Sequence, residues 1–310
     1  MAYPSAISFS MKYIRQFKST GTILAVTVET KSSSRNQRLL KSQPEAAAAD
    51  GIAALRHELG LDAPLPIRYL RWLGRAAVLD FGTSFRSGEP VSREILHRLP
   101  ITLTLACSAF VFTVFFSMAG GVLSALFPNR LPDRCHRIWT ICTVSIPDYW
   151  LGLMLLLIFS LRLNWLPVIG TNGFATFILP VVTLGLSISA AEGRIFRANI
   201  LEIFRQDYVL FASAKGLSQA KVFIRHVLPT AILPMISMWG MLLGHLLSGA
   251  VIVESVFSLP GLGKLAADAV LHRDFPMIQA TVLTMTLFFM LSSRAVDLLH
   301  LLLIPRYAKE

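Results

Sequence analysis

Five long apolar stretches limit what this chain can fold into more than any other feature of its sequence. They cover residues 101–127, 138–161, 175–191, 230–253 and 276–293. A bilayer core about 30 Å thick requires roughly 20 apolar residues at a helical rise of 1.5 Å per residue. A helix buried in a soluble domain seldom exceeds about 20 residues. The pattern therefore predicts an all-α polytopic membrane protein with five visible transmembrane helices, the third of which is marginal in length.

Composition supports this prediction and excludes several classes of function. Only 15% of the residues are charged, whereas soluble domains average nearer 25%. The net charge of +11 could indicate a nucleic-acid partner, but in a membrane protein it indicates basic loops held in the cytoplasm, so we expect contact with membrane lipid and no nucleic acid. The three cysteines lack CxxC spacing and the seven histidines show no HExxH pattern, so we predict neither a metal site nor a catalytic site.

The basic residues are concentrated in alternate loops. Residues 128–137 and 194–229 are rich in arginine and lysine, whereas residues 162–174 and 254–275 are poorer in both. The positive-inside rule places the first two loops, with the C-terminus, in the cytoplasm.

The domain organisation follows from this alternation. Residues 51–100 form an external segment, and residues 101–310 form the transmembrane domain with its cytoplasmic loop 194–229. Residues 1–50 form an atypical N-terminal segment without a span.

The cytoplasmic loop 194–229 is long for a simple connector. Gly216 is suited to end a short helix by adopting a positive φ angle, and Pro229 suits the first turn of the following span. The loop is either a plain connection or a structured surface on which a soluble partner docks.

The same loop resembles the EAA loop of ABC-importer permeases, most closely in the version of the peptide and nickel branch. Residues that agree with that branch are Asp207, Tyr208, Val209, Ala212, Ala214, Lys215, Gly216, Leu217, Arg225, His226 and Leu228. Leu228 and Pro229 stand at the L-P of the general pattern, whereas Leu210 and Phe211 replace its Glu and first Ala. The resemblance extends over roughly residues 52–306, including SIPDYWLG and VESVFSLPGLGKL.

The resemblance implies a type I permease fold with six spans in a bacterial inner membrane. It implies a translocation subunit of an ATP-driven importer, for peptides or alternatively for nickel or another metal complex. The implied partners are a second homologous permease, two ATP-binding subunits that hydrolyse ATP, and a periplasmic solute-binding protein. This chain would bind no cofactor, and no GxxxxGK[ST] motif occurs in it. A secondary transporter is less well supported, because the sequence shows no inverted repeats.

By the same resemblance, the loop would form a short coupling helix that docks in a groove of the ATP-binding subunit. The implied coupling residues are Asp207, Tyr208, Ala212, Ala214, Lys215, Gly216, Leu228 and Pro229.

Polar and small residues within the spans are further candidates. Asp148 lies mid-span by our prediction, where a charge is costly and faces a cavity or a partner. It lines the translocation path or makes a buried hydrogen bond at the Pro147 break. Three small residues at four-residue spacing, Gly240, Gly244 and Ser248, predict close helix packing, and His245 is expected to pack as well.

The N-terminus lacks the first span that the family typically has. Residues 18–43 are serine- and lysine-rich where about 20 apolar residues are needed. Two compensating frameshifts would produce this pattern; a genuinely divergent N-terminus is the alternative. Translating the DNA for residues 18–43 in the other two frames distinguishes them, since only the frameshift predicts a continuous apolar stretch.

Overall fold

The computed structural model describes residues 62–167 and 173–307 of a chain that divides into two compact units, Met1–Arg68 and Tyr69–Glu310. The description below concerns the second unit, apart from the first turn of helix α3. The predictions for segment 1–50, including the loss of a first span, concern residues outside the described part. Within the described residues, every element longer than a single bridge is a helix.

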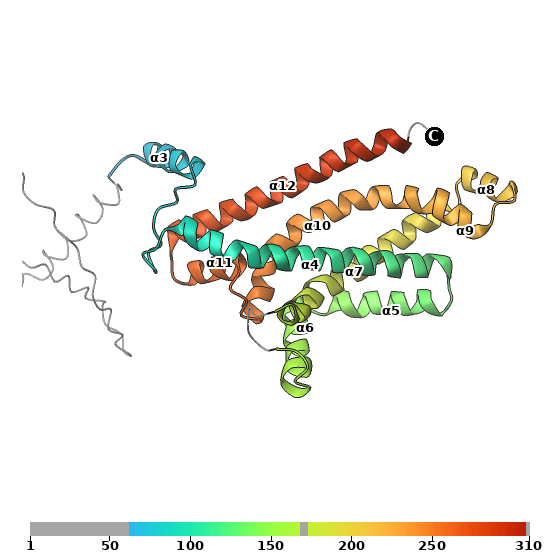
Figure 1. Cartoon of the computed structure of the whole chain (residues 1–310), viewed down its shortest axis with the longest axis horizontal. Helices are drawn as coiled ribbons and strands as arrows, with labels where there is room; N and C mark the ends of the chain where they lie inside the picture. Colours follow the sequence, from blue (N-terminus) through green and yellow to red (C-terminus); the bar gives the residue numbers. More distant parts are fainter. Residues whose placement is uncertain (1–61, 168–172, 308–310) are drawn as a thin grey trace, which may run out of the picture. The chain divides into compact units, whose positions relative to one another are not determined.

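Ten α-helices and two π-helical segments make up the described chain (Figure 1). The α-helices are α3 (Leu65–Ala77), α4 (Val91–Leu126), α5 (Leu131–Ser145), α6 (Asp148–Leu155), α7 (Ala175–Ile203), α8 (Asp207–Ala214), α9 (Gln219–Val222), α10 (Leu228–Val256), α11 (Leu262–Leu271) and α12 (Phe275–Tyr307). The π-helical segments are η1 (Leu156–Arg162) and η2 (Phe223–Val227).

Four of the five predicted spans are continuous helices, namely α4, α7, α10 and α12. Each is longer than its apolar stretch, because polar turns continue the helix beyond the lipid-compatible part. Helix α4 begins ten residues before the predicted span at residue 101, and α7 continues from residue 191 to Ile203.

The candidate span over residues 138–161 is bent at the Pro147 break. Helix α5 ends at Ser145, α6 begins at Asp148, and the two parts of this candidate span are bent by 101°. Proline lacks an amide hydrogen and disfavours the helical region for the residue before it. Ile146 accordingly has an extended ψ of 124° directly before Pro147. The described helices therefore supply four spans, or five if the bent pair crosses as one.

Helices α4, α7 and α10 form the centre of the bundle, and α12 packs along α10. Large side chains without exposed surface fill the core, among them Leu105, Phe196, Ile200, Met235 and Leu246.

Glycines allow the backbones to approach closely. A Cβ atom on Gly240 or Gly244 would collide with Val296 or Phe289 on α12, which confirms the close packing predicted for these two residues. The side chain of Ser248 lies outside the described part.

The two ends of the bundle differ. Figure 1 shows the α4–α5 turn and helices α8 and α9 at one end, and α11 with the start of α4 at the opposite end. The two loops predicted to be cytoplasmic, residues 128–137 and 194–229, thus lie at the same end.

A buried carboxylate organises the α11 end. Glu254, with no exposed surface, accepts hydrogen bonds from Thr102 Oγ1 at 2.6 Å and from the Lys264 amide at 2.9 Å. Thr102 Oγ1 in turn accepts the Leu262 amide at 2.7 Å. Helix N-termini have unpaired amides that favour negative charge, so Glu254 joins α10, α4 and the start of α11. A Cβ atom on Gly261 would collide with this carboxylate.

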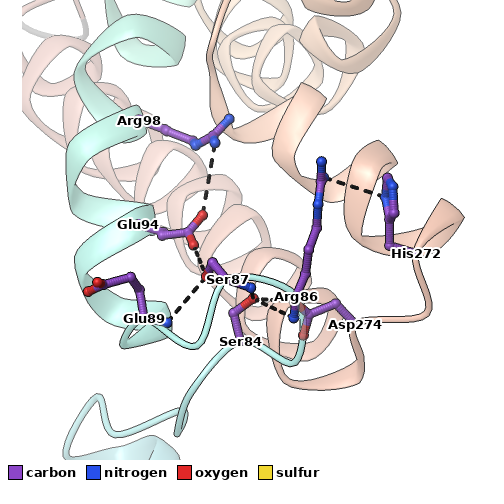
Figure 2. A network of polar contacts seen from close by, with 8 residues as sticks. All are labelled: Ser84, Arg86, Ser87, Glu89, Glu94, Arg98, His272 and Asp274. Carbon is purple, nitrogen blue, oxygen red and sulfur yellow. Dashed lines mark hydrogen bonds and ion pairs between the residues drawn. The ribbon is translucent and has the colours of Figure 1, made fainter. Parts of the chain in front are cut away.

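The turn before α4 is attached to the α11–α12 connection by a second polar network (Figure 2). Asp274, 3% exposed, accepts hydrogen bonds from the Ser84 hydroxyl and from the Phe85 amide at 3.2 Å. Ser87 donates to Glu94 in the first turn of α4. These contacts give the connection between α3 and α4 a defined course.

Candidate coupling site

Helix α8 is short because both of its ends are defined by local chemistry. Asp207 lies in the first turn, where a carboxylate interacts favourably with the helix dipole. The helix ends at Ala214, and Gly216 follows with φ +82°, as the sequence predicted. Its amide donates to the Ser213 carbonyl at 3.0 Å. Glycine reaches this left-handed region without the steric cost that other residues carry.

The inner face of α8 is anchored in the hydrophobic core. Val209 and Ala212 are 2% and 7% exposed and belong to the central cluster of buried residues. Phe204, just before the helix, stacks on Phe223 with a centroid distance of 6.1 Å. The position of α8 is therefore coupled to the ends of α7 and α10.

The outer face of α8 is apolar and uncovered. Tyr208, Leu210 and Phe211 are 46%, 56% and 61% exposed. The Lys215 ammonium lies 4.6 Å from the centroid of the Phe211 ring, a cation–π distance. An exposed cluster of this size commonly marks a protein–protein contact.

The segment after α8 leads into the next span without interruption. Pro229 lies in the first turn of α10, as predicted, but the helix already begins at Gln219 and runs through η2. A proline removes one backbone donor and its ring crowds the carbonyl four residues earlier, and a π-helical turn relieves this conflict. The η2 turn occupies the five residues before Leu228.

The structure brings the predicted coupling residues together. Six of them lie on α8 or directly after it: Asp207, Tyr208, Ala212, Ala214, Lys215 and Gly216. Leu228 and Pro229 begin α10. The hydroxyl of Tyr208 donates to Thr230 Oγ1 at 3.5 Å, so the start of α8 contacts the start of α10.

Sequence reasoning missed a buried ion pair at this end. Asp133 on α5 has no exposed side-chain surface, and Arg197 on α7 is 20% exposed. Arg197 Nη2 donates to Asp133 Oδ2 at 2.9 Å, and Nε makes an ion contact with Oδ1 at 2.7 Å without hydrogen-bond geometry. By sequence, Arg197 is one of the many basic residues of the loop 194–229, and the available signal was Asp133, the one acidic residue among the arginines of residues 128–137.

Asp148 lies at the bend within the candidate span that α5 and α6 form. It is the first residue of α6 after the bend, it is exposed, and it accepts a hydrogen bond from Ser187 Oγ at 2.9 Å. Asp148 lines an open hollow of about 650 Å³ together with Glu192 and His245. His245, which we expected to pack, is exposed there. Glu192 was missed because α7 was predicted to leave the membrane at residue 191.

Comparison with known proteins agrees with this architecture. Residues 117–309 match the family described as "Binding-protein-dependent transport system inner membrane component". The chain is 40% identical over 259 residues to the glutathione transport system permease protein GsiC of Salmonella paratyphi A (strain ATCC 9150 / SARB42), covering 84% of this chain and 85% of that protein. It is 39% identical, with the same coverage, to GsiC of Escherichia coli (strain K12).

Solved structures share the fold. The MetNI methionine ABC transporter in inward-facing conformations matches with a TM-score of 0.56 and 18% identity, over 67% of this chain and 95% of that chain. An amino acid ABC transporter crystallised with histidines matches with a TM-score of 0.55 and 18% identity, over 67% of this chain and 94% of that chain. The chain therefore belongs to the binding-protein-dependent transport system inner membrane components and is a multi-pass inner-membrane permease of the ABC-importer family.

Proposed function

We propose that this chain forms, with a second homologous permease, the path by which an ATP-driven importer moves peptides into the cell. Two ATP-binding subunits would supply the energy, and a periplasmic solute-binding protein would deliver the cargo. The curated relatives are named for transport of glutathione, a tripeptide, which favours peptides over nickel or another metal complex.

The observation that carries the coupling proposal is the uncovered outer face of α8. Tyr208, Leu210 and Phe211 are large apolar residues on a helix that lies with the basic loops. The positive-inside rule puts that end in the cytoplasm, where lipid tails do not cover them. We propose that a groove of the ATP-binding subunit covers this face, with Lys215 at its edge.

The same helix is built to pass movement onward. Its buried residues Val209 and Ala212 are packed in the core, and Tyr208 reaches Thr230 at the start of α10. Packed elements move as rigid bodies rather than deform continuously. A displacement of α8 by the ATP-binding subunit would therefore move the end of α7 and the start of α10 together.

Co-purification tests the docking surface. Phe211→Ser removes an exposed aromatic side chain and should weaken recovery of the ATP-binding subunit about tenfold or more, as for an aromatic hot spot. Leu271→Ser is the matched control, since Leu271 is 78% exposed on α11 at the opposite end. Full recovery with Phe211→Ser would refute the docking assignment.

Transport by the complete importer tests the cargo. Proteoliposomes that contain both permeases and the ATP-binding subunits, supplied with the binding protein, should take up L-alanyl-L-alanine only with ATP inside. Uptake of nickel without uptake of the dipeptide would favour the alternative cargo.

A further inference from the structure

The hollow beside Asp148 differs in charge from the rest of the molecule. Its polar lining consists of Asp148, Ser187, Glu192 and His245, contributed by α6, α7 and α10. No lysine or arginine lines it among the described residues, although the chain carries a net charge of +11. Two carboxyl groups thus face one space that His245 shares but that no lysine or arginine lines among the described residues.

Glu192 lacks a hydrogen-bond partner for one of its oxygens. The residue is 7% exposed and lines the hollow. The Trp239 indole interacts with the Glu192 carboxyl group, but this contact falls short of hydrogen-bond geometry, and neither Glu192 Oε2 nor Trp239 Nε1 makes a well-formed hydrogen bond within the described part of the chain. Burying an unpaired polar group, and above all a charged one, is costly. The arrangement therefore suits a site in which a donor from another molecule completes the hydrogen bonding.

The apolar part of the lining indicates a second property of the group that this hollow would bind. Met238 and Met241 lie on the same helix as His245 and border the carboxyl groups. Methionine side chains adapt to apolar groups of different shape. The hollow thus offers acceptors for a cation next to a surface that tolerates varied apolar side chains.

We infer that this hollow binds the ammonium group of the cargo during translocation, with Glu192 and Asp148 as acceptors and the methionines against the neighbouring side chain. The inference rests on the proposed peptide-import function and adds a recognition site to it. A peptide carries an α-ammonium group beside a side chain of variable shape, which is the combination that the lining fits.

A substitution in the complete importer tests this site. Proteoliposomes of phosphatidylcholine, which lacks a primary ammonium group, exclude a lipid headgroup as the source. Transport of L-alanyl-L-alanine and of N-acetyl-L-alanyl-L-alanine is compared in the wild type, Glu192→Gln and Asp148→Asn. Glu89→Gln is the matched control, because it makes the same change of charge at an exposed position outside the hollow.

The ratio of the two transport rates is the decisive quantity, because the preference of the binding protein itself is common to all variants. In Glu192→Gln and Asp148→Asn the preference for the free dipeptide should fall about tenfold, as expected when a charge-assisted bond is lost. The ATP hydrolysis that the loaded binding protein stimulates should persist. An unchanged ratio would overturn the inference. If the wild type fails to transport the dipeptide at all, the proposed function fails instead.

A second variant keeps the test decisive if Glu192→Gln lowers the amount of assembled importer. Met241 is 60% exposed, so Met241→Lys does not disturb the core and places a competing ammonium group beside the carboxylates. It should block dipeptide transport, whereas Leu271→Lys, which adds the same charge at a residue 78% exposed outside the hollow, should not. Normal transport by Met241→Lys would refute the site.

Discussion

Replacing Gly216 tests whether the turn after α8 must have its observed shape for the importer to assemble. Gly216 has φ +82°, and a Cβ atom built on it would meet nothing within 4 Å. A side chain therefore causes no collision, and its cost comes from the backbone conformation alone. Non-glycine residues carry roughly 1–2 kcal/mol in the left-handed region, with asparagine and aspartate the better tolerated. Valine, which is β-branched, is among the least suited there.

The series Gly216→Asn, Gly216→Asp and Gly216→Val separates backbone conformation from charge. A cost of 1–2 kcal/mol corresponds to about a 5- to 30-fold change in an equilibrium, so Gly216→Val should weaken binding of the ATP-binding subunit by that factor. Gly216→Asn should stay close to the wild type. Gly216→Asp adds a negative charge at the C-terminal end of α8, which is unfavourable by about 0.3–1 kcal/mol, and should fall between the two.

Titration of the ATP-binding subunit onto permease complexes in nanodiscs measures the three dissociation constants. The amount of each variant in the membrane fraction serves as the control, since the turn lies outside the spans and insertion should be unaffected. Wild-type affinity for Gly216→Val would contradict the coupling assignment. Equal loss in the Asn and Val variants would show that the conformational reasoning is wrong.

Three further predictions concern the bundle and its orientation. Asp133→Asn leaves the largely buried Arg197 without its counter-charge and should destabilise the permease by about 2–3 kcal/mol. This is below the value for fully buried pairs because Arg197 is 20% exposed. An unchanged thermal transition in detergent would contradict this prediction. Gly240→Leu should separate α10 from α12 at a cost of about 1–3 kcal/mol, whereas Gly240→Ala should cost less, and equal thermal stability of the two variants would refute the packing argument. In a cysteine-free background, Leu271→Cys should react with an impermeant thiol reagent in intact cells and Gln219→Cys should not, and the opposite result would reverse the orientation.

The structure also improves the choice of labelling position at the external end. Gly263 lies in the first turn of α11, where a Cβ atom would lie 2.6 Å from the Val251 Cα. A cysteine at Gly263 would report on damaged packing rather than on orientation. Leu271 is 78% exposed and avoids this problem.

Features that depend on local chemistry could be predicted from the sequence. Four of the five predicted spans are continuous helices in the structure. They could be predicted because lipid requires a long run of apolar residues. The positive φ of Gly216 and the place of Pro229 follow from the conformational limits of these two residues. The break at Pro147 could be predicted for the same reason, but the 101° angle between α5 and α6 could not.

Features that depend on which helices become neighbours could not be predicted. Asp133 and Arg197 are 64 positions apart, and no local pattern indicates that they pair. Glu192 and His245 meet at one hollow only because α7 and α10 pack together. The lengths of α4 and α7 were also underestimated. Helical hydrogen bonding continues into polar turns, which a hydropathy pattern assigns to loops.

The unbroken course of the helix from Gln219 into α10 has a mechanical consequence. Its 29 residues up to Leu247 measure about 43 Å at the helical rise. If a helix of about this length pivots at one end as a rigid body, a tilt of about 5° displaces its other end by roughly 4 Å. His245 and Met241 lie near the far end of this helix, so under the proposed coupling a small displacement of α8 would change the width of the hollow by a distance comparable to the diameter of an ammonium group. The η2 turn and Pro234 both interrupt the regular hydrogen bonding of this helix, and their stiffness would determine how much of the displacement is transmitted.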